Sequence, residues 1–97
     1  MGLIISERIM AKIAQDDHGN ISPKEVQECF DNHCGGFCTD DRESHKTNPP
    51  TLWFVSETNQ RRKLKITYVR DGSDVFLKSA YLATAQVTHI YERYCKF

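Results

Sequence analysis

The chain has 97 residues, of which 39% are hydrophobic and 27% are charged, a composition typical of a soluble globular protein. Thirteen Lys and Arg residues balance thirteen Asp and Glu residues, so no overall charge attracts the protein to nucleic acid or to a membrane surface. The apolar runs are short and the N-terminus has no basic region before a long apolar one, so we expect neither a membrane span nor a secretory signal. We therefore expect a single domain over residues 1–97, located in the cytoplasm, with its four cysteines reduced.

The N-terminal third of the sequence predicts two helices. In residues 3–15 the apolar side chains recur at helical spacing, and residues 16–20 break the pattern with Gly and Asn. A second helix begins at Ser22, which forms a capping box with Glu25 and is followed by Pro at the first helical position. The pair Gly35-Gly36 ends this helix.

The rest of the chain predicts a loop, three strands and a last helix. Residues 37–50 are polar and end in two prolines, whereas residues 51–58 form an apolar strand expected to be buried on both faces. Residues 60–81 form a hairpin that turns at Asp71-Gly72, and helical spacing returns from about residue 84. The fold class is therefore α+β, in the order α-α-β-β-β-α, with a small antiparallel sheet packed against helices.

Positive charge is concentrated in the hairpin. Residues 1–50 carry five Lys and Arg against nine Asp and Glu, whereas residues 51–97 carry eight against four. On the first hairpin strand, Lys63 and Lys65 alternate with apolar residues, so one face is basic. We interpret this face as a phosphate-binding surface, with Arg62 and Lys78 near strand ends where they could hold a phosphate. The alternative is a solvated outer face whose lysines discourage aggregation between strand edges.

Two further sets of residues could carry chemistry. The loop brings Arg42 and His45 close to carboxylates, which suits general acid–base catalysis, although its charges could simply satisfy one another. Tyr81 could stack on a base or donate to a phosphate, but core packing explains it equally well.

A third set has residue types that bind metals. Its spacing contains no CxxC pair, and buried cysteines commonly act as small hydrophobic residues, so we expect no metal and no cofactor. Structural zinc is the weaker alternative. The set consists of Cys29, His33, Cys34, Cys38 and His45.

Beyond these patterns, the sequence resembles the BrnT-like toxins of bacterial toxin–antitoxin modules, which are small ribonucleases of the RelE-like fold. The element order and the following motifs carry the resemblance: His18-Gly19, E-V-x-E-C-F ending at Phe30, Asp41-Arg42, Arg62, and K-S-A-Y-x-A-T from Lys78 to Thr84. A second pattern, from Gly35 to Thr58, reads GGF…D-x-R-E-x-H-x-T-x-P-P-T-x-W-F-x-x-E-T. It is similar to a group of small bacterial proteins, some of which are labelled ADP-ribosyl-dinitrogen-reductase hydrolases.

The resemblance implies a metal-independent endoribonuclease. Arg42, Arg62 and Lys78 match basic positions of the BrnT-like pattern, whereas His45 belongs to the second pattern. In this hypothesis Arg62 and Lys78 would bind the phosphate, Arg42 would stabilise the transition state, and His45 would serve as acid or base. The partners would be RNA and a cognate antitoxin that masks the basic face, in a homodimer or a toxin–antitoxin hetero-oligomer. The supporting RNA contacts would come from Arg61, Lys63, Lys65 and Tyr81.

The sequence also departs from the BrnT-like pattern. Tyr81 stands where these toxins tend to have Arg, Arg61 replaces a turn Gly, and Asp17 replaces a Lys. The loss of two basic positions keeps a second hypothesis open, a non-catalytic module that binds RNA or a protein on the same scaffold. An ADP-ribose-related activity is the third.

Overall fold

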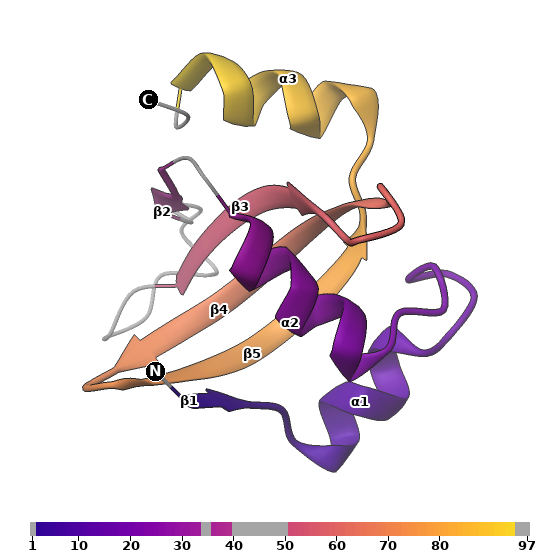
Figure 1. Ribbon diagram of the computed structural model, residues 1–97, viewed down its shortest axis with the longest axis vertical. Helices are drawn as coiled ribbons and strands as arrows, with labels where there is room; N and C mark the ends of the chain where they lie inside the picture. Colours follow the sequence, from indigo (N-terminus) through magenta and orange to yellow (C-terminus); the bar gives the residue numbers. More distant parts are fainter. Residues whose placement is uncertain (1, 34–35, 40–50, 95–97) are drawn as a thin grey trace.

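The computed structural model describes residues 2–33, 36–39 and 51–94. The described part is an α+β fold, which confirms the predicted class (Figure 1). Its elements in chain order are β1 (Gly2–Ile4), α1 (Glu7–Ile13), α2 (Pro23–Asn32), β2 (Cys38–Thr39), β3 (Thr51–Glu57), β4 (Lys63–Asp71), β5 (Asp74–Leu82) and α3 (Ala85–Tyr94).

The sheet is larger than the sequence predicted and is mixed. Its five strands lie in the order β1-β5-β4-β3-β2, and β1 runs parallel to β5 with Leu3 opposite Val75. The three predicted strands are present as β3, β4 and β5 and pair in the antiparallel sense, but the prediction missed β2 and the parallel strand β1. Strands of two and three residues are too short to show the alternation on which a sequence prediction depends.

Helices α1 and α2 cover one face of the sheet, α2 lying across β3 and β4 and α1 against β5 (Figure 1). The capping box of α2 is confirmed, since Ser22 Oγ accepts from the Glu25 amide and the Glu25 carboxylate accepts from the Ser22 amide. The ring of Phe30 on α2 meets Phe54 and Tyr68 edge-on, at centroid distances of 5.0 and 5.4 Å. We call this side of the sheet the closed face. Its fully buried residues include Ile13, Val26, Phe54, Leu64 and Ile66.

The opposite side of the sheet is covered less completely. Helix α3 packs against β3, where the ring of Tyr91 lies 6.0 Å from that of Trp53. Leu52, Trp53 and Val55 keep part of their surface exposed, so the prediction that β3 is buried on both faces is confirmed only in part.

A β-bulge interrupts the pairing of β4 with β5. Thr67 pairs with Ser79, but its neighbour Tyr68 pairs with Leu77, which leaves Lys78 without a partner. Leu77 and Ala80 are consequently both buried in the core although they are three residues apart. Lys78 and Ser79, which lie between them, belong to the side opposite the closed face.

Candidate nucleic-acid interface

Cationic and aromatic side chains lie side by side on the sheet, opposite the closed face. Lys65 on β4 pairs with Tyr81 on β5 and with Val55 on β3. The Lys65 Nζ atom lies 4.8 Å from the centroid of the Trp53 ring and 5.5 Å from that of the Tyr81 ring. Both distances suit a cation–π interaction, so one lysine bridges two aromatic rings across three strands. We call the set Trp53, Lys63, Lys65, Lys78 and Tyr81 the cationic–aromatic face.

The turn after α1 fixes the position of Tyr81. The His18 ring packs against the Tyr81 ring at 5.7 Å, and His18 Nδ1 donates to the Ala80 carbonyl at 3.1 Å. The amide of Leu82 in turn donates to the His18 carbonyl at 3.3 Å. These contacts hold one side of the tyrosine ring while the side chain stays partly exposed. A ring held in this way loses little conformational entropy when a ligand stacks on it.

Two hydroxyl groups on the same side of the sheet have no hydrogen-bond partner among the described residues. They belong to Thr67 and Ser79, which lie opposite each other in adjacent strands, and both oxygen atoms are buried. A buried hydroxyl without a partner costs free energy, so this part of the sheet is not optimised for stability.

The side chain of Arg62 contacts other residues of the protein and does not point freely into solvent. Its guanidinium donates through Nη1 to the carboxylate of Glu25, with which it forms an ion pair, and through Nη2 to the carbonyl of Gly19. The side chains of Arg62 and Glu25 are 32% and 17% exposed. Arg62 therefore joins the start of β4 to the first turn of α2 and to the turn after α1.

The structure does not bring the two predicted phosphate anchors together. The guanidinium of Arg62 contacts groups on the helix-covered side of the sheet, whereas Lys78 is exposed on the cationic–aromatic face. The prediction that they grip one phosphate is corrected accordingly, because strand alternation and the bulge direct them to opposite faces. Arg42 and His45 lie outside the described residues, in the segment that joins β2 to β3.

The predicted cysteine and histidine cluster is divided between different environments. Cys29 is a free, fully buried thiol, and burial together with the nearby carboxylate of Glu25 raises its pKa from 9.0 to about 12, so it stays protonated. Cys38 is disulfide-bonded, which differs from the expectation that all cysteines are reduced. His33 packs its ring on Phe54 at 4.2 Å, while Cys34 and His45 lie outside the described residues. Within residues 2–33, 36–39 and 51–94, no three His, Cys, Asp or Glu side chains are grouped to hold a metal ion.

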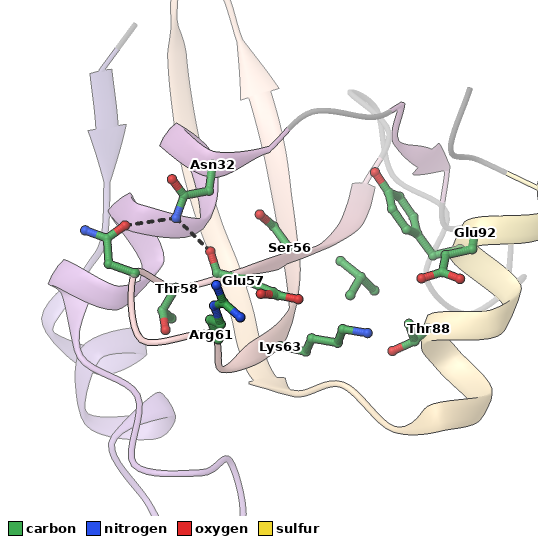
Figure 2. Close-up of a pocket in the computed structure, with 11 residues that line it drawn as sticks. Asn32, Ser56, Glu57, Thr58, Arg61, Lys63, Thr88 and Glu92 are labelled. Atoms are coloured by element: carbon green, nitrogen blue, oxygen red, sulfur yellow. Dashed lines mark hydrogen bonds between the residues drawn. The ribbon is translucent and has the colours of Figure 1, made fainter.

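A cavity of about 580 Å³ opens beside the cationic–aromatic face (Figure 2). It lies between the end of α2, the outer edge of β3, the β3–β4 turn and α3. Arg61 and Lys63, two of the predicted RNA contacts, are on its wall. The full lining is Asn32, Val55, Ser56, Glu57, Thr58, Asn59, Arg61, Lys63, Thr88, Tyr91 and Glu92.

Sequence reasoning missed Trp53 and this cavity. It placed Trp53 in a strand buried on both faces, yet the alternation from Phe54 already puts Trp53 on the same side as Lys65 once β3 and β4 are paired. The cavity had no sequence signal, since its residues come from three separate segments of the chain.

In the part of the chain that the structure describes, no helix is both long and apolar enough to cross a membrane. Comparison with protein-family models, curated proteins and solved structures finds no match to this chain. Function must therefore be inferred from the site itself.

Proposed function

We propose that this protein binds single-stranded RNA through the cationic–aromatic face. The observation that carries the proposal is the position of Lys65 between the half-buried rings of Trp53 and Tyr81. Exposed aromatic rings on a sheet can stack on unpaired bases, and each such stack contributes about 1–3 kcal/mol to binding. Lysines beside the rings can contact the phosphates that link those bases.

The neighbours of Lys65 extend its positive charge along the sheet. Lys63 and Lys78 are exposed, and neither forms an ion pair with another described residue. Duplex RNA presents no unstacked base to a tyrosine or tryptophan ring, so the arrangement favours single strands.

The proposal is tested by measuring the affinity of the protein for a labelled oligoribonucleotide by fluorescence anisotropy, with the RNA as a single strand and as the matching duplex. Because Cys38 is disulfide-bonded, each titration is carried out with and without a thiol reductant. We expect the single strand to bind more tightly, and Tyr81→Leu to weaken its binding about tenfold by removing one stacking ring. Lys65→Gln should weaken binding and reduce the dependence of log affinity on log salt concentration by about one unit.

Lys24→Gln supplies the matched control, because Lys24 is an exposed lysine on α2, on the other side of the sheet. Equal RNA affinities of the Lys24 and Lys65 variants would contradict the proposal, as would equal affinities for single strand and duplex.

A second candidate is the endoribonuclease toxin that the sequence resemblance implies. Two observations support it. Lys78 is exposed, and the segment that contains Arg42 and His45 leads directly into β3, which begins at Thr51. Thr51 pairs with Val69 on β4, which pairs in turn with Phe76 on β5, two residues from Lys78.

Cleavage of RNA in the presence of EDTA, together with slowed growth on expression, would support the toxin hypothesis. The double variant Arg42→Ala, His45→Ala should lose both effects but retain RNA binding. If the protein binds RNA without cleaving it, the toxin hypothesis is rejected and the non-catalytic binding module is retained. A gene for a small antitoxin next to this one, and a complex of its product with this protein, would identify the partner that masks the face.

A further inference from the structure

The cavity beside the cationic–aromatic face continues the same surface. Val55 and Lys63 line it, and they lie two residues from Trp53 and Lys65 on the same strands and on the same side of the sheet. A strand of RNA that crosses the sheet from β5 to β3 reaches the cavity at the outer edge of β3. There the end of α2 and helix α3 flank the cavity on two sides (Figure 2).

Two cationic side chains, Arg61 and Lys63, line the cavity beside Glu57, which pairs with Lys63 across the strands. Arg61 and Lys63 make no ion pair with another described residue, in contrast to Arg62 between them. The backbone of Arg61 has φ = 64°, a left-handed conformation that a residue with a side chain rarely adopts. This conformation belongs to the turn between β3 and β4, where the Arg61 amide donates to the Thr58 carbonyl at 2.9 Å, and from this turn Arg61 lines the cavity.

The opposite wall offers groups of another kind. Thr88 and Glu92 come from α3, and Figure 2 shows Lys63 extending from β4 toward them. A carboxylate and a hydroxyl can accept from, or donate to, the hydroxyl groups of a ribose, whereas a guanidinium and an ammonium bind a phosphate. Hydrogen bonds join the end of α2 to β3 and to the β3–β4 turn at the edge of the cavity, since Asn32 Nδ2 donates to the Glu57 carbonyl at 2.9 Å and to Asn59 Oδ1 at 3.0 Å.

We propose that this cavity binds a ribonucleoside monophosphate, the terminal nucleotide of a bound RNA strand. Arg61 and Lys63 hold its phosphate, and Glu92 and Thr88 hold its ribose hydroxyls. The volume of about 580 Å³ lies in the range of pockets that enclose ligands of this size. The assignment to a strand end rests on the proposed RNA binding, but the binding of a free nucleotide does not.

The first test is calorimetric titration of the whole protein with nucleoside 5′- and 3′-monophosphates, the corresponding nucleosides, and inorganic phosphate. We expect one of the monophosphates to bind at least about tenfold more tightly than either its nucleoside or phosphate alone. Equal affinity for inorganic phosphate would reduce the cavity to an anion site and overturn the proposal.

Arg61→Gly is the decisive variant because glycine adopts positive φ without strain. It removes the guanidinium while the thermal unfolding midpoint stays the same or rises, so lost binding cannot be attributed to unfolding. We expect this variant to lose about tenfold in nucleotide affinity, and Glu92→Gln to lose affinity for ribonucleotides more than for 2′,3′-dideoxyribonucleotides. Unchanged affinity of Arg61→Gly would overturn the proposal.

The RNA interface and the nucleotide cavity can be refuted independently of each other. Tyr81→Leu should leave the affinity for the mononucleotide unchanged while weakening the binding of the oligoribonucleotide. RNA binding that depends on Tyr81, without mononucleotide binding, would refute the cavity alone. Mononucleotide binding that depends on Arg61, without RNA binding, would refute the RNA interface and leave the cavity as a nucleotide site.

Discussion

The two faces of the sheet differ in what their side chains do. On the closed face, Phe54, Leu64 and Ile66 are at most 1% exposed and pack beneath α2. On the opposite face, Trp53 and Lys65 lie next to these residues in sequence and remain half-buried. Because strand residues alternate between faces, one strand can stabilise the fold and present a binding surface at the same time. The free energy of folding should therefore depend mainly on one face, and ligand affinity on the other.

The same division separates Arg61 from Arg62. Arg62 contacts Glu25 and Gly19 and so ties β4 to the helical layer, whereas Arg61 is exposed at the cavity with a left-handed backbone. Two adjacent residues of identical type are thus expected to have opposite effects when they are replaced.

The comparison predicts its largest effect at Ile66. Ile66→Ala removes a fully buried side chain and should lower the free energy of unfolding by about 3 kcal/mol. Lys65→Ala, one residue earlier and on the other face, should lower it by less than about 1 kcal/mol, the size of its cation–π contacts. Urea denaturation measures both, and similar losses for the two variants would show that the faces do not divide these tasks.

Arg62 should have the next largest effect. Arg62→Ala leaves the Glu25 carboxylate, 17% exposed, without its ion pair and the Gly19 carbonyl without a donor. We expect the free energy of unfolding to fall by about 2 kcal/mol, a value reduced for the partial exposure of the pair. Lys78→Ala is the control and should unfold at nearly the wild-type urea concentration. If both variants unfold together, Arg62 is not the structural residue that its contacts indicate.

Local patterns predicted the closed face well and the arrangement of side chains on the opposite face poorly. The capping box of α2 and the alternation of Leu64 and Ile66 with Lys63 and Lys65 are short-range signals, and both are present in the structure. The α+β class follows from them.

The pairing of β1 with β5 and the bulge at Lys78 depend on contacts between distant segments, which periodicity does not encode. The bulge determines on which face of the sheet Lys78 lies, and the ion pair with Glu25 makes Arg62 a structural residue. Basic charge alone could therefore not distinguish a ligand-binding residue from a structural one.

The raised pKa of the buried Cys29 thiol makes the stability of the protein depend on pH. Its pKa is raised to about 12 in the folded protein by burial and by the Glu25 carboxylate, against 9.0 for an exposed thiol. Above pH 9 the unfolded chain releases this proton while the folded chain retains it, so stability falls as the pH rises toward 12. Between pH 9 and 10 this thiol should cost up to about 1 kcal/mol. Urea midpoints at both pH values should show a smaller loss for Cys29→Ala than for the wild type; equal losses would mean that the thiol ionises in the folded state.

The smallest predicted effect has the opposite sign and concerns the side of the sheet opposite the closed face. Thr67→Val replaces a buried hydroxyl that has no partner among the described residues by a methyl group of similar shape. Removal of an unsatisfied polar atom should raise the free energy of unfolding by about 1 kcal/mol and the thermal midpoint by several degrees. Thr58→Val is the control: Thr58 Oγ1 accepts from the amides of Gln60 and Arg62, so its loss should destabilise. A destabilised Thr67→Val variant would show that the hydroxyl has a partner in the folded protein, and that this face is as well satisfied as the closed one.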